Sequence, residues 1–111
     1  MLVAVYGSLK KGRYNHGMLK DSKFIGDTEV IGTLYKVSSY PVLLDGDTEY
    51  AAEVYEVEDD VYEPIESMEL GAGYEVRKMD TEYGEAVCFY GEPDVWDERV
   101  AKGYITKISE Y

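Results

Sequence analysis

The amino-acid sequence predicts an α+β domain: a small, mostly antiparallel β-barrel with one main helix and one short helix. Short apolar segments rich in Val, Ile, Thr and Tyr recur along the chain and are separated by glycine-containing breaks, as expected for strands. Only one stretch, residues 59–70, carries apolar residues at the three- and four-residue spacing of a helix. With 111 residues, 45% of them apolar, we expect a single domain spanning residues 1–111.

The first third of the chain is predicted to hold a strand, a short helix and a longer strand region. Leu2–Tyr6 is apolar and β-prone and stops at a glycine. After a polar stretch, Asn15–Lys20 can form one or two helical turns. Phe24–Val37 follows as strand, with a bend or bulge expected at Gly32.

The middle third is predicted to form a hairpin. Pro41–Leu44 precedes the sequence Asp45-Gly46-Asp47, the strongest hairpin-turn signal in the chain, and Ala51–Val57 follows it. We therefore expect two strands that meet at this aspartate–glycine turn.

The main helix is expected from a cap at Asp59 or Asp60 to about Leu70. If the cap lies at Asp60, Pro64 falls near the first turn, where proline is tolerated. One face carries the residues at helical spacing: Val61, Tyr62, Ile65, Met68 and Glu69. Glycines end the helix, and three further strands are predicted at Tyr74–Met79, Ala86–Tyr90 and Tyr104–Ile108.

The charge balance excludes some partners. The 23 acidic and 11 basic residues give a net charge of −12, which repels nucleic acid and anionic membranes. The lone cysteine, Cys88, cannot form an internal disulfide, and its apolar surroundings favour a buried structural thiol. We found no stretch typical of a signal peptide or a membrane span, so we expect a cytoplasmic protein.

Two features could carry chemistry. The first predicted strand ends in Tyr6-Gly7-Ser8-Leu9, and a glycine here lets successive backbone N–H groups point at an anionic ligand. Taken alone this motif could equally be a turn. Glu69 lies toward the apolar side of the helix, where partial desolvation would raise its pKa into the range of a base. Spacing alone leaves open whether it is a base or a surface charge.

The residues also resemble a known family, the γ-glutamyl cyclotransferases, closest to the short γ-glutamylamine cyclotransferase and AIG2-like members. The shared landmarks occur in the family's order over about residues 3 to 90: Val5-Tyr6-Gly7-Ser8-Leu9-Lys10-Lys11-Gly12, Asn15-His16, Leu19, Gly32-Thr33-Leu34-Tyr35, Tyr40-Pro41, Glu53-Val54-Tyr55-Glu56-Val57, Met68-Glu69 and Tyr74-x-x-Arg77.

The resemblance implies an enzyme that releases 5-oxoproline and an amine from a small γ-glutamyl amine or γ-glutamyl peptide. It implies Glu69 as general base and acid, and Tyr6, Gly7, Ser8 and Leu9 as the substrate-binding loop. It implies neither a metal nor a cofactor. A binding module of the same fold without turnover is the alternative, and the oligomeric state stays open.

The remaining landmarks have more than one interpretation. Tyr6 could line the pocket or pack in the core, and Asn15 is expected to tie the loop down. Arg77 could orient a carboxylate such as Glu53 or reach the site, and a strand-face ion pair is the preferred interpretation. Tyr35 and Tyr90 could line the pocket. Two features depart from the family pattern: Glu69-Leu70-Gly71 replaces Glu-Gly, and the tail from Trp96 to Tyr111 matches only loosely. Because that tail often helps the family to select the leaving amine, the identity of the amine is left open.

Overall fold

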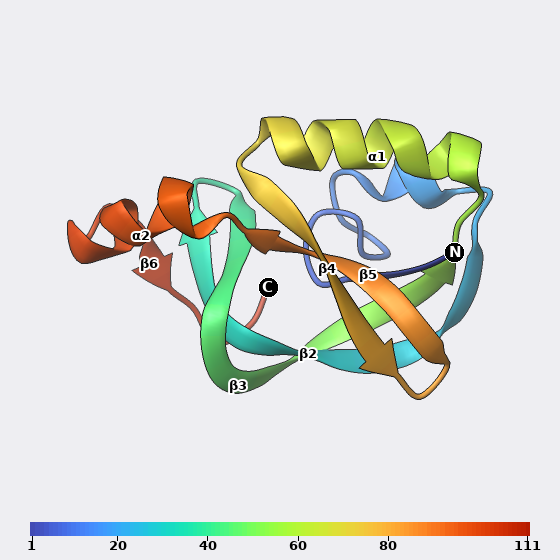
Figure 1. The fold of residues 1–111 in the computed structure, drawn as a ribbon, viewed down its shortest axis with the longest axis horizontal. Helices are drawn as coiled ribbons and strands as arrows, with labels where there is room; N and C mark the ends of the chain where they lie inside the picture. Colours follow the sequence, from blue (N-terminus) through green and yellow to red (C-terminus); the bar gives the residue numbers. More distant parts are fainter.

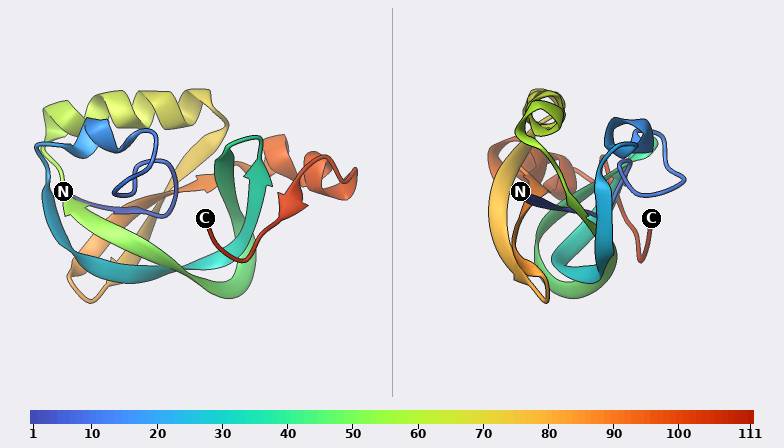
Figure 2. Two further views of the ribbon diagram at one scale, coloured as in Figure 1. Left: turned by 180° about the vertical axis from the view of Figure 1, so that it is seen from behind. Right: turned by 90° about the vertical axis from the view of Figure 1, so that its right-hand side faces the viewer.

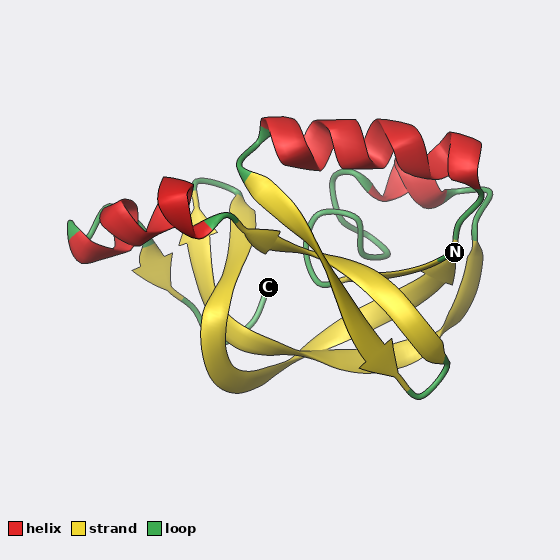
Figure 3. Cartoon of the chain, viewed as in Figure 1, coloured by secondary structure: helices red, strands yellow, loops and turns green.

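A computed structural model describes residues 1–111, which form one strongly curled six-stranded sheet with helices packed on its outside (Figure 1). The elements in chain order are β1 (Leu2–Val5), the 3-10 helix η1 (His16–Leu19), β2 (Lys23–Val37), β3 (Tyr40–Glu56), α1 (Asp59–Gly71), β4 (Tyr74–Thr81), β5 (Gly84–Gly91), α2 (Pro93–Ala101) and β6 (Thr106–Lys107). The α+β class is confirmed, as the separate helices and strands of Figure 3 show.

The sheet has the strand order β4-β5-β1-β3-β2-β6. All neighbouring pairs are antiparallel except β1 and β5, which run parallel. The long strands β2 and β3 are bent along their length, so that the sheet curls into a half-barrel (Figure 2). The predicted mostly antiparallel barrel is thus present as a mixed, curled sheet whose edge strands are β4 and β6.

Strand β1 is apolar throughout because both of its faces are buried. Val3 and Val5 pack toward the outside of the curl, with residues of α1 and η1. Ala4 and, just after the strand, Tyr6 pack toward its inside, with Val30 and other residues of β2, β3 and β5. Side chains alternate between faces along a strand, so one short segment connects the two halves of the core.

Helix α1 covers the outer side of the sheet through the face that the spacing predicts, with Tyr62 and Ile65 buried. Its N-cap is Glu58 rather than either predicted aspartate, and Pro64 lies in the second turn rather than the first. The Glu58 carbonyl accepts from the Tyr62 amide at 2.9 Å, so the helix starts one residue earlier than expected. None of the helices is long and apolar enough to cross a membrane.

The predicted hairpin turn at Asp45-Gly46-Asp47 is wrong. Strand β3 continues through these residues without reversing, and the chain reverses instead at Ser38-Ser39, between the paired residues Val37 and Tyr40. The three residues form a bulge, because Gly32 pairs with Thr48 whereas Thr33 pairs with Leu44. The irregularity expected at Gly32 is therefore confirmed. Gly46 lies against Gly32 and Thr33 so closely that a Cβ atom would overlap them.

The C-terminal part differs most from the prediction. Helix α2 was not expected from the sequence, and the strand expected at Tyr104–Ile108 is reduced to the two residues of β6. Trp96 of α2 is buried against Val42, Leu44 and Ile105, which anchors the helix beside the β2–β3 hairpin. The chain then returns across β2 to Tyr111, between the hairpin and the loop after β1 (Figure 2).

Candidate active site

A cavity of about 350 Å³ opens between the loop after β1, the last turn of α1, the start of β4 and the tip of the β2–β3 hairpin. This volume is within the roughly 300–1,000 Å³ range of small-molecule sites. The lining residues are Ala4, Val5, Tyr6, Gly7, Ser8, Leu9, Asn15, Val37, Tyr40, Pro41, Met68, Glu69, Ala72, Tyr74, Phe89 and Trp96. All five residues predicted for the site, Tyr6 to Leu9 and Glu69, lie together in this lining.

The loop after β1 presents backbone donors that no protein group uses. The amides of Gly7, Ser8 and Leu9 donate to no acceptor within the chain. The loop carbonyls are engaged instead: Gly7 accepts from the Lys10 amide at 3.0 Å and Ser8 accepts from the Asn15 amide at 2.8 Å. Three successive unused N–H groups at a cavity are suited to bind an anionic oxygen.

Several contacts hold this loop in shape. Asn15 Nδ2 donates to Ser8 Oγ at 2.9 Å, so Asn15 ties the loop down as expected and also reaches the cavity. His16 Nδ1 lies 2.9 Å from the Leu9 carbonyl oxygen. The Lys11 amide donates to the Glu53 carboxylate at 2.9 Å. The donor arrangement is therefore fixed before any ligand arrives.

Tyr6 lines the cavity with its ring while its hydroxyl belongs to the core. The hydroxyl donates to the Phe89 carbonyl at 2.6 Å and accepts from the Leu43 amide at 3.2 Å. Burial raises the pKa of Tyr6 well above its usual value. Because both hydrogen-bonding directions are occupied, Tyr6 positions the loop and is not a free proton donor.

Glu69 is the one acidic residue of the lining. Its side chain is partly buried in the last turn of α1, and its carboxylate makes no hydrogen bond or ion pair with any protein group. Burial raises the pKa of Glu69 from 4.5 to about 7. A carboxylate with free lone pairs, a cavity beside it and a pKa near neutrality has the properties of a general base.

Four aromatic residues of the lining were not predicted as site residues: Tyr40, Tyr74, Phe89 and Trp96. Tyr74 follows the glycine turn after α1, and its hydroxyl donates to the Pro41 carbonyl at 2.7 Å, which joins β4 to the hairpin. Burial and the Glu69 carboxylate raise the pKa of Tyr74. Trp96 Nε1 donates to the Gly73 carbonyl at 2.7 Å. Pro93 at the start of α2, followed by Asp94, is the sequence signal that could have revealed this helix.

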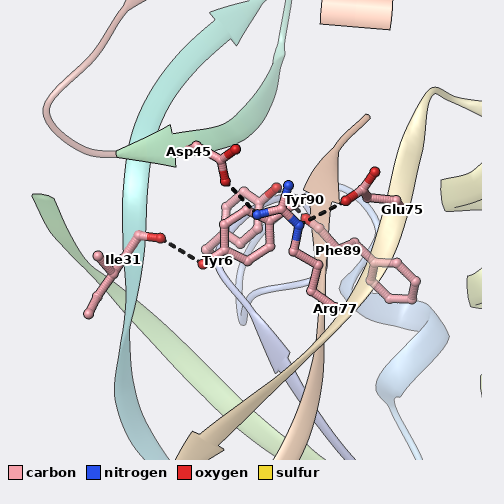
Figure 4. Close-up of polar contacts among 7 residues, drawn as sticks. All are labelled: Tyr6, Ile31, Asp45, Glu75, Arg77, Phe89 and Tyr90. Carbon is pink, nitrogen blue, oxygen red and sulfur yellow. Dashed lines mark hydrogen bonds and ion pairs between the residues drawn. The ribbon is translucent and has the colours of Figure 1, made fainter. Parts of the chain in front are cut away.

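Arg77 does not reach the cavity, and the prediction that it contacts Glu53 is wrong. The guanidinium donates to Asp45 at 2.6 Å and to Glu75 at 2.8 Å, and it lies 4.5 Å from the centre of the Tyr90 ring (Figure 4). The strand-face ion pair expected for Arg77 is thus present with other carboxylates.

Tyr35 and Tyr90 do not line the cavity either. The Tyr90 hydroxyl donates to the Ile31 carbonyl at 2.6 Å, and Tyr35 packs near Trp96. Cys88 is fully buried, and burial raises the pKa of its thiol to about 12, so it is a structural thiol as predicted. No group of three or more His, Cys, Asp or Glu side chains is arranged to hold a metal ion.

Comparisons with known proteins agree on one family. A family model described as gamma-glutamyl cyclotransferase, AIG2-like, matches residues 3–106. A Pyrococcus horikoshii protein named "Putative gamma-glutamylcyclotransferase" is 36% identical over 106 residues, which cover 96% of this chain and 91% of that protein. A Vibrio cholerae protein of the same name is 32% identical over 88 residues, covering 77% and 76%.

The fold agrees as well. The crystal structure of the Pyrococcus horikoshii protein is similar with a TM-score of 0.75 and 28% sequence identity, covering 94% of this chain and 97% of that one. The curled sheet, its helices and its cavity therefore define an α+β enzyme of the cyclotransferase type. The chain belongs to the AIG2-like γ-glutamyl cyclotransferase family, which confirms the resemblance.

Proposed function

We propose that the protein releases 5-oxoproline and a free amine from a γ-glutamyl amine or γ-glutamyl peptide, with Glu69 moving the proton. The observation that carries the proposal is the pairing of one unpartnered, partly desolvated carboxylate with three unused loop amides across a single cavity. Family membership supports the reaction type.

In the proposed reaction, the loop amides of Gly7, Ser8 and Leu9 bind the γ-glutamyl group. Glu69, in its ionised form, takes a proton from the substrate's uncharged α-amino group as the lone pair of that nitrogen attacks the γ-carbonyl carbon and closes a five-membered ring. Since both reacting groups belong to one molecule, holding the substrate in a folded-over conformation supplies much of the acceleration.

The second half of the reaction returns the proton. The tetrahedral intermediate collapses as the bond between the γ-carbon and the leaving nitrogen breaks, and protonated Glu69 donates to that nitrogen. The products are 5-oxoproline and the amine, and Glu69 is again a carboxylate. A pKa near 7 suits both roles, because each protonation state of Glu69 is accessible near neutral pH.

The test is release of 5-oxoproline from a panel of γ-glutamyl amines and γ-glutamyl amino acids, with the amine quantified in parallel. We expect both products in equal amounts from the wild-type protein and a loss of roughly 100-fold or more in Glu69→Gln. The matched control is Glu63→Gln, the same change at an exposed position of the same helix, which should retain activity. Binding without release from any panel member would instead support the non-enzymatic alternative.

A further inference from the structure

We propose that Tyr111 is a positioning residue of the site, which holds the end of the β2–β3 hairpin on the loop after β1. Residues 106–111 form a strap that runs from β6 across β2 and ends between the hairpin and this loop (Figure 2). The kinetic consequence of this role rests on the proposed function, whereas the geometry rests on the contacts that Tyr111 makes with both elements.

The end of the hairpin forms part of the cavity and lies directly on the loop after β1. Val37, Tyr40 and Pro41 of the hairpin line the cavity. Pro41 lies so close to the loop that a Cβ atom at Gly7 would be 2.6 Å from Pro41 Cγ. The position of the hairpin therefore determines how much room a ligand has beside the unused loop amides.

The turn at the end of the hairpin is held by contacts from outside it. Ser38 has a φ of 55°, in the left-handed region that a residue with a side chain rarely adopts. The Tyr74 hydroxyl donates to the Pro41 carbonyl at 2.7 Å. The Tyr111 hydroxyl donates to the Ser39 carbonyl at 2.8 Å. Tyr74 is itself a lining residue, whereas Tyr111 is not, so Tyr111 holds the turn from outside the cavity.

The same residue also contacts the loop after β1. The Arg13 guanidinium lies 4.7 Å from the centre of the Tyr111 ring, within reach of a cation–π attraction. Lys10 Nζ donates to the Tyr111 carbonyl oxygen at 3.3 Å. Tyr111 therefore joins the loop to the hairpin, which are the two elements that meet at Gly7 and Pro41.

The rest of the strap is lightly packed. Its two strand residues, Thr106 and Lys107, are both exposed. A second cavity, of about 100 Å³, is lined by Ser109, Glu110 and Tyr111 together with residues of the sheet, so the strap does not fill the space beneath it. Because so little of the strap is packed, removal of the Tyr111 contacts should release the hairpin end more than it loosens the centre of the sheet.

Release of the hairpin end should weaken substrate binding and leave the chemical step unchanged. A site that is correctly arranged for only a fraction of the time binds with an affinity reduced by that fraction. The contacts of Tyr111 involve Lys10, Arg13 and Ser39 and do not include Glu69, which is proposed to move the proton. We therefore expect a higher KM at an unchanged kcat when these contacts are removed.

Two substitutions of Tyr111 separate its contacts. Tyr111→Phe loses the bond to Ser39 but keeps a ring beside Arg13, and we expect KM for 5-oxoproline release to rise about threefold. Tyr111→Ala loses both contacts, and we expect KM to rise about tenfold with kcat within about twofold of wild type. The matched control is Tyr104→Ala, which removes a 72% exposed tyrosine that does not line the cavity and should leave both constants unchanged.

Two kinetic results would overturn the proposal. One is a KM for Tyr111→Ala within about twofold of wild type, which would show that the strap does not hold the site. The other is a fall in kcat at unchanged KM, which would place the effect of Tyr111 on the chemical step instead of on the arrangement of the site.

Amide hydrogen exchange followed by NMR gives a second readout that does not depend on turnover. The Lys10 and Asn15 amides each donate to a carbonyl of the loop after β1. In Tyr111→Ala their exchange should become faster by about fivefold more than that of Val3, in the central strand β1. An equal change at all three amides would show that Tyr111 acts through global stability, and would overturn the positioning role.

The failure of this inference can be distinguished from the failure of the proposed function. If wild-type protein releases no 5-oxoproline from any γ-glutamyl compound, the proposed reaction is wrong and the exchange measurement still decides about Tyr111. Faster exchange concentrated at Lys10 and Asn15 supports the positioning role, whereas unchanged exchange at these two amides refutes it.

Discussion

Replacing Glu69 by glutamine should stabilise the folded protein at high pH and leave its stability unchanged at low pH. Burial raises the pKa of Glu69 from 4.5 to about 7 in the folded chain. Between these two values the folded state holds a proton that the unfolded state has lost, so stability falls as pH rises through this window. Below pH 4.5 the Glu69 carboxyl is neutral in both the folded and the unfolded state. Above pH 7 it is ionised in both states, and the folded protein carries the full destabilisation that comes from burying the charge.

The magnitude follows from the size of the shift. About 7 minus 4.5 is about 2.5 pKa units, which corresponds to roughly 3 kcal/mol at about 1.4 kcal/mol per unit. Because the Glu69 side chain is only partly buried, solvent screening lowers the expected effect to about 1–2 kcal/mol. Glutamine has nearly the shape of the neutral acid, so it should remove this penalty without creating a cavity.

The assay is urea denaturation of wild-type and Glu69→Gln protein at pH 4 and pH 8.5, with Glu63→Gln as the exposed control on the same helix. The difference between Glu69→Gln and wild type should be near zero at pH 4 and about 1–2 kcal/mol in favour of the variant at pH 8.5. A difference that does not change with pH would show that Glu69 titrates normally, and would refute the desolvated-base account.

Three further outcomes follow from the same geometry. The kcat/KM for 5-oxoproline release should fall about tenfold per pH unit below pH 7, because the base Glu69 must be ionised; a flat profile from pH 5 to 8 in steady-state assays would contradict this. Gly7→Ala should raise KM several-fold, because the Cβ atom of the alanine would lie 2.6 Å from Pro41 Cγ at the cavity. Unchanged kinetics would show that the loop can move to accommodate the methyl group without loss of substrate binding. Asn15→Ala should lower the free energy of unfolding by about 1 kcal/mol in urea denaturation and should raise KM, because the 2.9 Å hydrogen bond to Ser8 Oγ is lost. A change in stability without a change in KM would show that Asn15 supports the fold but not substrate binding.

The parts of the molecule that follow local patterns could be predicted from the sequence. The face of α1 with Ile65 and Glu69 follows from three- and four-residue spacing, and β1 follows from an apolar run that ends at a glycine. The loop Gly7–Leu9 could be recognised as a family landmark, but its three unused amides are visible only once the hydrogen bonds are known.

The parts that depend on distant contacts could not be predicted. The Asp45-Gly46-Asp47 signal is local, whereas the continued pairing of β2 and β3 on either side turns it into a bulge. Arg77 pairs with Asp45 from a strand 32 residues away, so spacing gives no indication of that partner. Trp96 reaches the cavity only because α2 folds back onto the hairpin. In each case contacts between residues far apart in the sequence, and not the local sequence pattern, determine the structure.

The role that we propose for Glu69 is to move the proton during ring closure. The most direct measurement is a single-turnover assay of 5-oxoproline release with Glu69→Gln in excess over a γ-glutamyl amine, alongside the dissociation constant for the same compound. We expect a rate lowered by roughly 100-fold or more, with a dissociation constant within about threefold of wild type. Release at the wild-type rate by Glu69→Gln would contradict it.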